Sequence, residues 1–362
     1  MNSKNKILVV SNMYPDTKHP SYGVFVEKFC RQLETTGINY DLSVMHKSDN
    51  VIEKALGYFL FYSHTFFEVL CGKYDMIYVH YPSFSGAPVD LASHIRYRKI
   101  YTNLHGSDVI PESHVHERMQ KYTRKLIARS EKIIVPSEYF KGVVVKKYGV
   151  KEESVYIYPS GGIDKKIFHA RQKEEIDGFK RKYGIHNCYP ILGFAGRIIK
   201  DKGWDVFVDA ASNICGNVNF VIVGTGYEDS LLEKKIRELK LDIIWIKKLL
   251  SQDELSLFYS ACDFFVFPTK RDGESLGLVA VEAMACGTPV IASDYAAPRF
   301  YIKDGYNGFK FVMGSSRALA EKMNKALLLS DADKIKLNHG AVSTAEHYFC
   351  ENLQDSFSEI FK

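Results

Sequence analysis

Two glutamates eight residues apart are the side chains of this sequence best placed to do chemistry. Glu274 and Glu282 lie in the stretch GESLGLVAVEAMACGTPVIAS, between apolar runs at 264–267 and 290–292, a pattern that predicts strand, loop, helix and strand. If the helix begins near Glu274, a rise of about 1.5 Å per residue separates the carboxylates by roughly 12 Å. Paired glycosidase carboxylates lie roughly 5–9.5 Å apart, so the spacing favours an extended ligand with hydroxyl groups at both ends.

The predicted first turn of this helix lies between the two carboxylates and offers an anion site. Backbone N–H groups at a helix start lack intrahelical partners, and the helix dipole adds positive potential there. A glycine in the turn lets a ligand approach the backbone closely. The residues of this turn are Ser275, Leu276, Gly277 and Leu278. An anion site flanked by two acceptors suits a nucleotide sugar, and the alternative is an ordinary amphipathic helix with two solvated glutamates.

A second charged segment follows the strand predicted at 191–195. In GRIIKDKG, residues 196–203, Arg197 and Lys202 stand just before a predicted helix. Arginine can hold a diphosphate with two parallel hydrogen bonds, and lysine can add a point charge. The segment therefore favours binding of a diphosphate, and the alternative is a solvated basic loop.

These two segments resemble the signature motifs of glycosyltransferase family 4, retaining enzymes with the GT-B fold. The resemblance implies that Glu274 contacts the donor sugar and Glu282 the ribose. It also implies that Arg197 and Lys202 hold the pyrophosphate. The resulting fold class is α/β, with two doubly wound Rossmann-like domains facing a central cleft.

Other family motifs are matched more loosely. His105 and Asp108, at the end of a predicted strand, resemble a His-Gly-x-Asp motif, which implies that His105 lies near the reacting sugar and Asp108 on the acceptor side. The resemblance assigns Gly23 and Gly224 to donor-binding turns. Leu249 would lie where the family's backbone reads the nucleotide base, although the family usually has glycine where Lys248 stands.

Alternating strand and helix patterns on both sides of a polar stretch predict two domains. Strand-like runs lie at 7–10, 40–45, 76–80, 99–104 and 132–135 before this stretch and resume at 191–195 after it. Turn residues at 156–166 and polar residues at 171–182 are interpreted as the passage between domains. We expect an N-terminal domain at 1–165 on the acceptor side and a donor domain at 166–347. By the resemblance, residues 348–362 cross back to the first domain.

Composition narrows the class of protein. The 362 residues are 46% hydrophobic and 25% charged, with a net charge of +5 that gives no warrant for nucleic-acid binding. Seven cysteines without a Cys-x-x-Cys pair indicate reduced thiols in a cytoplasmic protein. No secretory signal is visible, and the longest apolar stretch, 55–70, is interrupted by polar residues.

The function that these features favour is transfer of a hexose-type sugar from a UDP- or GDP-linked donor. The resemblance implies a glycan or lipid-linked acceptor in surface polysaccharide synthesis, such as capsule or lipopolysaccharide. No cofactor and no metal are expected, because side-chain cations and a helix end supply positive charge. Two alternatives stay open: a nucleotide-sugar epimerase or phosphorylase on the same fold, and a non-catalytic nucleotide-sugar-binding protein.

One region suggests a membrane partner. Residues 91–151 contain thirteen Lys or Arg against five Asp or Glu, and an aromatic run lies upstream at 58–67. Docking on the anionic inner face of the cytoplasmic membrane would use both features. The alternative is that the aromatic side chains fill the core and the cations keep the protein soluble, and the sequence leaves both readings open.

Overall fold

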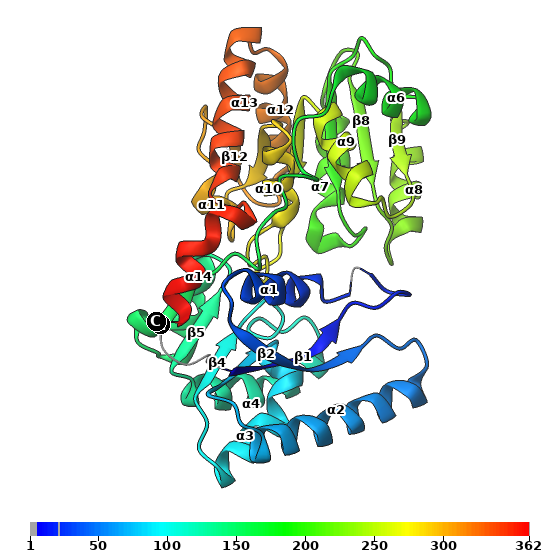
Figure 1. Ribbon diagram of the computed structural model, residues 1–362. Helices are drawn as coiled ribbons and strands as arrows, with labels where there is room; N and C mark the ends of the chain where they lie inside the picture. The colour runs from blue at the N-terminus through cyan, green and yellow to red at the C-terminus, as the bar shows by residue number, and fades with distance from the viewer. Residues whose placement is uncertain (1–5, 21, 362) are drawn as a thin grey trace. The chain divides into compact units, whose positions relative to one another are not determined.

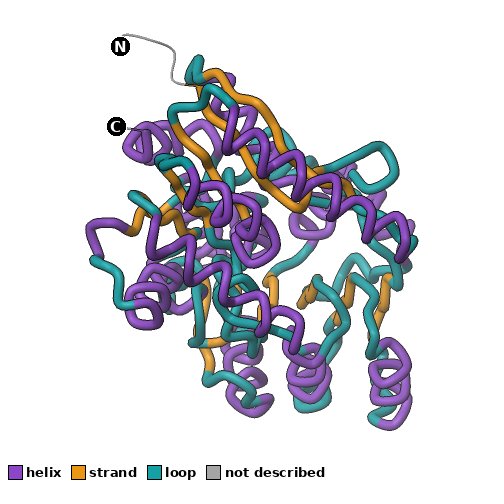
Figure 2. The backbone as a smooth tube through the Cα atoms, turned by 90° about the horizontal axis from the view of Figure 1, so that it is seen from below, coloured by secondary structure: helices purple, strands orange, loops and turns teal. Residues whose placement is uncertain are grey.

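The computed structural model describes residues 6–20 and 22–361, which divide into two compact units (Figure 1). The first contains the described residues up to Gly162 together with those from Leu353 onward, and the second spans Ile163–Asn352. Each unit contains a six-stranded parallel sheet with helices beside it (Figure 2), as expected for two doubly wound domains. The sequence prediction placed the boundary after residue 165 and the returning segment at 348–362.

The sheet of the first unit has the strand order β2-β1-β3-β4-β5-β6. Its strands are β1 Lys6–Tyr14, β2 Asn39–His46, β3 Met76–His80, β4 Ile100–Asn103, β5 Lys132–Val135 and β6 Val155–Ile157. Its helices are α1 Val24–Thr35, α2 Val51–Cys71, α3 Pro82–Ile95, α4 His114–Arg129, α5 Glu138–Tyr148 and the C-terminal α14 Gln354–Phe361, with a 3₁₀ turn at Glu152–Ser154. Parallel strands are buried on both faces, which explains their nearly unbroken apolar runs.

Alternate residues of β1 serve two different cores. Ile7 and Val9 belong to a cluster that includes Phe29 of α1 and Phe357 of α14. Leu8 and Val10 belong to a separate cluster with side chains of α2, α3 and α4. The period of two along a strand therefore places α1 and α14 on one face of the sheet and α2 to α4 on the other.

The sheet of the second unit has the strand order β12-β11-β10-β7-β8-β9. Its strands are β7 Ile191–Ala195, β8 Asn219–Val223, β9 Ile243–Ile246, β10 Phe264–Phe267, β11 Val290–Ser293 and β12 Gly308–Phe311. Its helices are α6 Lys173–Tyr183, α7 Trp204–Ala211, α8 Asp229–Glu238, α9 Gln252–Ala261, α10 Leu278–Ala285, α11 Pro298–Tyr301, α12 Ser316–Leu327 and α13 Asp331–Glu346, with a 3₁₀ turn at Lys200–Lys202. A further 3₁₀ turn, Cys350–Leu353, spans the boundary between the two units. The strand order puts β10 directly beside β7.

The interpretation of residues 171–182 as a passage between domains was wrong, because most of them form α6 within the second unit. A capping box between Gln172 and Glu175 begins this helix. Its one buried side chain, Phe179, lies 6.4 Å from the ring of Phe258 on α9, measured between centroids. Because this helix buries a single aromatic ring, its sequence is mostly polar and resembles that of a linker, which explains the error.

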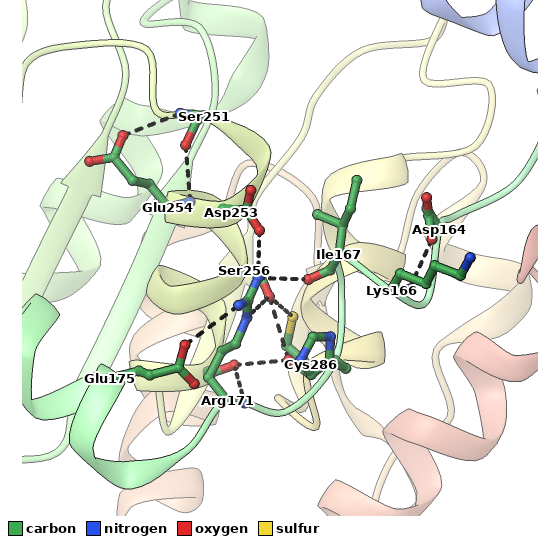
Figure 3. A network of polar contacts seen from close by, with 12 residues as sticks. Asp164, Lys166, Ile167, Arg171, Glu175, Ser251, Asp253, Glu254, Ser256 and Cys286 are labelled. Atoms are coloured by element: carbon green, nitrogen blue, oxygen red, sulfur yellow. Dashed lines mark hydrogen bonds and ion pairs between the residues drawn. The ribbon is translucent and has the colours of Figure 1, made fainter.

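Arg171, just before α6, ties the start of the second unit to α9 (Figure 3). Its guanidinium donates to the Ser256 hydroxyl at 3.0 Å, to the carbonyl of Ile167 at 3.1 Å and to the Asp253 carboxylate at 2.8 Å. These bonds hold the incoming chain against α9. None of the helices in the described ranges is long and apolar enough to cross a bilayer.

The C-terminal helix α14 completes the core of the first unit. Leu353, Phe357 and Ile360 are buried there, and the ring of Phe357 lies 5.5 Å from Phe29 and 5.4 Å from Tyr158. The last residues of the chain therefore stabilise a unit whose other residues all precede residue 163.

Replacing Phe357 by alanine should destabilise the first unit by about 3–5 kcal/mol, the usual cost of emptying a buried phenylalanine site. Hydrogen exchange measured by mass spectrometry should become faster in peptides from β1 and β3 and stay unchanged in peptides from β7 and β8. Gln354→Ala, at an exposed position of the same helix, is the control and should change neither set. Equal acceleration in both units would contradict the assignment of α14 to the first core.

Candidate active site

A buried ion pair joins two loops at the carboxyl edge of the second sheet. Lys202 follows β7 and Glu274 follows β10, and the lysine Nζ lies 2.6 Å from the glutamate Oε2. The Thr269 hydroxyl donates to the same oxygen at 3.2 Å. Glu274 is only 8% exposed. The two residues are 72 positions apart and meet because β10 pairs with β7.

The surroundings keep Glu274 ionised. Burial acts to raise the pKa of this carboxyl, but the charges of Lys202 and Arg271 and the hydrogen bonds from Lys202 and Thr269 outweigh it. The net pKa therefore lies below the usual value for glutamate. At neutral pH the carboxylate can only accept hydrogen bonds, as a contact to sugar hydroxyls requires.

Glycines allow the loops after β7, β8 and β10 to pack closely together. Gly203 has a φ of +79°, and a Cβ there would clash with the carbonyl oxygen of Pro268. Gly224 has a φ of +128°, and a Cβ would clash with the carbonyl oxygen of Gly196. The N–H of Ile198 also donates to the carbonyl of Thr225 at 3.1 Å. Gly224 is thus needed for loop packing, and its contact with a donor stays a prediction.

Arg197 lies on the same loop as Lys202, and its side chain is exposed. The two cations therefore differ: one is held in a buried ion pair, and the other is accessible to solvent. An exposed guanidinium beside a fixed ammonium can engage an incoming anion without first leaving a buried partner.

The turn before α10 differs from the prediction. The helix begins at Leu278, not near Glu274, because Gly277 has a φ of +78° and ends the turn in the left-handed region. The helical rise therefore cannot give the distance between Glu274 and Glu282, and the 12 Å argument was wrong. Ser275 and Leu276 belong to the turn before the helix rather than to its first turn.

Tyr301 holds this turn in place, a contact that the sequence did not reveal. Its hydroxyl donates to the carbonyl of Leu276 at 3.1 Å and lies 3.4 Å from the carbonyl of Gly277. A Cβ at Gly277 would approach the Tyr301 oxygen to 3.0 Å and the Phe267 ring to 2.8 Å. The absence of a side chain at Gly277 therefore lets the turn lie directly on two aromatic rings.

Glu282, on α10, is half-buried and accepts a hydrogen bond from the Tyr259 hydroxyl at 3.3 Å. Tyr259 is fully buried on α9, so α9 orients this carboxylate. Leu249 lies between β9 and α9 and is 79% exposed. The roles of Glu282 at the ribose and of Leu249 at the base stay predictions.

In the first unit, His105 follows β4 and stands against aromatic neighbours. Its Nε2 lies 3.1 Å from Nδ1 of His80, and its ring lies 4.2 Å from that of Phe25 between centroids. Burial lowers the pKa of His105 to about 3, so the imidazole is neutral at physiological pH.

Asp108 orders the loop that carries His105. It is fully buried, and its carboxylate accepts the backbone N–H of His105 at 3.0 Å and of Gly106 at 2.7 Å. Burial raises the pKa of Asp108 to about 6, although these backbone hydrogen bonds act to lower it. In this arrangement the carboxylate faces its own loop, and a direct role on the acceptor side stays a prediction.

Gly23 precedes α1 with a φ of +78°, and a Cβ there would lie 2.6 Å from the carbonyl carbon of Met13. The close approach of this turn to the end of β1 therefore requires glycine. A contact between Gly23 and the donor phosphate stays a prediction.

The chain contains an Asp-x-Asp triplet, a motif of metal-dependent glycosyltransferases of the other major fold. Asp331, Ala332 and Asp333 form the first turn of α13, where Asp333 pairs with Lys336 at 3.1 Å. Acidic residues in a first turn stabilise the helix dipole. Within residues 6–20 and 22–361, no three His, Cys, Asp or Glu side chains are grouped so that they could hold a metal ion.

Comparison with known proteins places both units in one enzyme family. Residues 23–164 match the family model described as Glycosyltransferase Family 4, and residues 175–340 match the model described as Glycosyl transferases group 1. The chain is 29% identical over 250 residues to an uncharacterized glycosyltransferase of Methanocaldococcus jannaschii, covering 69% of this chain and 64% of that protein.

Two further relatives are named for bacterial surface glycans. The capsular polysaccharide biosynthesis glycosyltransferase CapM of Staphylococcus aureus is 28% identical, over 64% of this chain and 62% of that protein. The lipopolysaccharide 1,2-N-acetylglucosaminetransferase of Salmonella typhimurium is also 28% identical, over the same shares. The matched region thus spans less than two thirds of the length of these curated relatives.

Solved structures match the whole fold at low identity. HepE of Anabaena, in complex with UDP and glucose, aligns with a TM-score of 0.76 and 17% identity over 99% of both chains. Sucrose-phosphate synthase from Thermosynechococcus elongatus aligns with a TM-score of 0.78 and 18% identity, over 99% of this chain and 98% of that chain. With both units matched by family models and the fold shared throughout, the chain belongs to glycosyltransferase family 4 and has the GT-B fold.

Proposed function

We propose that this protein is a retaining glycosyltransferase that moves a hexose-type sugar from a UDP- or GDP-linked donor to a glycan or lipid-linked acceptor. The observation that carries the proposal is the buried pair of Lys202 and Glu274, with the exposed Arg197 on the same loop. This group offers two cations for a diphosphate and an ionised acceptor for sugar hydroxyls. The nucleotide sugar is a co-substrate, and the proposed reaction uses no cofactor or metal.

The proposed chemistry breaks the bond between the anomeric carbon and the diphosphate oxygen. Arg197 and Lys202 stabilise the negative charge that develops on the departing diphosphate, usually the largest electrostatic contribution to such a reaction. Glu274 holds the sugar hydroxyls while the acceptor oxygen bonds to the anomeric carbon and its proton passes to the departing diphosphate. Retention of configuration follows from the family resemblance and requires attack on the face that the diphosphate leaves.

The donor class and the pathway are supported by similar proteins. HepE of Anabaena was solved with UDP, with UDP and glucose, and with UDP-glucose. Two relatives are named for capsule and lipopolysaccharide synthesis. We therefore propose a role in surface polysaccharide synthesis, in which the protein acts at the inner face of the cytoplasmic membrane.

The donor can be identified by thermal shift with UDP-glucose, UDP-galactose, UDP-N-acetylglucosamine and GDP-mannose. A true donor at about 100 times its dissociation constant should stabilise the protein by about 2.7 kcal/mol. Release of nucleoside diphosphate that depends on an added acceptor would support transfer. Interconversion of sugars without an acceptor would favour an epimerase, and binding without turnover on any acceptor would favour a non-catalytic protein.

Arg197→Ala should lower turnover by about 100-fold, which corresponds to roughly 3 kcal/mol of lost transition-state stabilisation. The melting temperature should stay unchanged because the side chain is exposed. Release of nucleoside diphosphate measures the first effect, and Lys200→Ala, at an exposed position of the same loop, is the matched control. Near-normal turnover in folded Arg197→Ala would remove this residue from the site.

Lys202→Met should reverse the way in which stability depends on pH, because it removes the ion-pair partner of a buried carboxyl. In the wild type the pKa of Glu274 is lowered, so its contribution is present above the unfolded pKa and lost as pH falls through the folded pKa. In Lys202→Met we expect burial to outweigh the remaining effects of Arg271 and Thr269, so that the folded pKa rises above the unfolded value. Stability should then be lost as pH rises above about 4.5, reaching a loss of about 3–5 kcal/mol at pH 7.

Melting temperatures between pH 4.5 and 8 test this prediction. The difference between wild type and Lys202→Met should widen with pH, and adding Glu274→Gln should restore most stability without restoring turnover. A difference that stays constant with pH would contradict a buried ionised pair.

A further inference from the structure

Helices α2 and α3 of the first unit expose a large share of the protein's accessible apolar side chains. Twenty large hydrophobic side chains are exposed among the described residues, of which six lie on α2 and two on α3. We call these eight the apolar face: Val51, Ile52, Leu56, Phe59, Leu60, Phe67, Leu91 and Ile95. A large apolar patch is unusual on a monomeric protein and marks a surface that another molecule covers.

Helices α2 and α3, together with α4, also line a groove of about 640 Å³, and three residues of the apolar face belong to its lining. Phe59 and Phe67 of α2 and Leu91 of α3 line it. Tyr62, also in the lining, donates its hydroxyl to the carbonyl of Phe84 at 2.9 Å and therefore presents its ring. Lys125 of α4 and Asp90 of α3 also line the groove and form an ion pair at 3.0 Å. The apolar part of the lining thus suits hydrocarbon, and the charged side chains of the lining are paired with each other.

The neighbouring helix α4 carries five Lys or Arg against one Glu. Lys125 and Arg129 pair with the buried Asp90, at 3.0 and 3.4 Å. Lys121 and Arg124 are exposed. An apolar surface bordered by cations complements an anionic bilayer, which offers hydrocarbon beneath negative headgroups. A second copy of the chain would instead bring the same cations to the interface.

We propose that the apolar face of α2 and α3 docks on an anionic lipid bilayer, with the exposed cations of α4 against the headgroups. The aromatic run 58–67 contains both core and surface side chains. Phe61 is 4% exposed and fills the core, whereas Phe59 is 67% exposed and belongs to the apolar face. A lipid-linked acceptor rests on the proposed function, but the docking does not, so vesicle binding tests it without a donor or acceptor.

Sedimentation with vesicles of phosphatidylcholine, alone or with about one third phosphatidylglycerol, tests the docking. Binding should require the anionic lipid, weaken with salt and fall about 30-fold in Lys121→Glu/Arg124→Glu, since each cation near the surface contributes roughly fivefold. These two positions leave the ion pairs of Asp90 intact. Lys234→Glu/Arg237→Glu, at exposed positions of α8, is the control and should bind like the wild type.

The apolar contribution is tested separately. Leu56→Gln/Phe59→Gln/Phe67→Gln should abolish binding, whereas Leu231→Gln/Leu239→Gln/Leu328→Gln, at exposed positions of the second unit, should not. The emission of Phe59→Trp should shift to the blue with anionic vesicles. Equal recovery in the supernatant with both vesicle types at low salt would overturn the proposal. So would a lipid-free dimer that only the first triple variant dissociates, since a second copy would then cover the face.

A different observation concerns His80, whose buried ring has one nitrogen without a partner. His80 ends β3, is 1% exposed and lies with its Nδ1 3.1 Å from Nε2 of His105. Its Nε2 has no hydrogen-bond partner among the described residues. The ring of Phe29 stands nearly perpendicular to the His80 ring, with an interplanar angle of 77° and centroids 4.9 Å apart. Burial lowers the pKa of both histidines, so both rings are neutral and each carries one N–H.

Two proton arrangements fit this pair. Either His80 donates from Nδ1 to His105, or His105 donates from Nε2 to His80, which then carries its own proton on the partnerless Nε2. Buried N–H groups without an acceptor are rarer than buried acceptors without a donor. The first arrangement therefore prevails, and it leaves the proton of His105 on Nδ1.

We infer that His80 is a positioning residue that holds His105 in the Nδ1–H tautomer, so that the Nδ1 atom of His105 is a donor, not an acceptor. The contribution of this donor to turnover rests on the proposed function, whereas the tautomer does not. Nitrogen-15 NMR of histidine-labelled protein reports the tautomer directly, with His105→Gln to assign the signal.

His80→Asn keeps an N–H close to the position of Nδ1 and should preserve both the tautomer and most of the turnover. His80→Leu removes it and should shift His105 to Nε2–H, lowering kcat about tenfold or more with KM little changed. Protonation of His105 on Nε2 in the wild type, or an unchanged tautomer in His80→Leu, would overturn the inference. A shifted tautomer without loss of turnover would overturn only the catalytic part.

Discussion

The ion pair between Lys202 and Glu274 is the interaction on which the candidate site depends. A carboxylate that is 8% exposed is costly without a nearby cation and hydrogen bonds. Thr269 and Arg271 lie on the loop of Glu274 itself, but the paired cation Lys202 is present because β10 lies beside β7, which brings together two residues that are 72 positions apart. The strand order of the second sheet is therefore a condition for the charge state of the site, not only a description of the fold.

Close packing of the backbone supports this pair. Gly203 lies against Pro268, which ties the loop of Lys202 to the loop that leads to Glu274. Tyr301 holds the carbonyls of the turn that follows Glu274. A side chain at Gly203 would push its loop away from Pro268, and a longer separation between Lys202 and Glu274 would weaken their attraction. The ion pair thus depends on the close backbone packing that glycine allows.

The first unit contains two features of possible functional importance, the buried His105 and the exposed apolar face, and they differ in how far the unit itself orders them. Around His105, the buried Asp108 and His80 occupy the backbone and one ring nitrogen, which orients the imidazole before any ligand arrives. On α2 and α3, by contrast, large apolar side chains stay exposed although burying each would be favourable. One feature is preorganised by contacts within the unit, and the other is left exposed to the surroundings.

The sequence by itself determined most of the strands, the two-domain α/β plan and the family, because buried parallel strands appear as apolar runs and because the motifs around Arg197 and Glu274 are local; it missed the short strands β6 and β12. It could not show that α10 begins only after Gly277. Glycine can adopt a positive or a negative φ, and the packing of this turn against Phe267 and Tyr301 selects the positive value. Nor could it separate Phe59 from Phe61 on α2, or pair His80 with His105. Only the tertiary structure decided these points, because each depends on which distant segment packs against the residue.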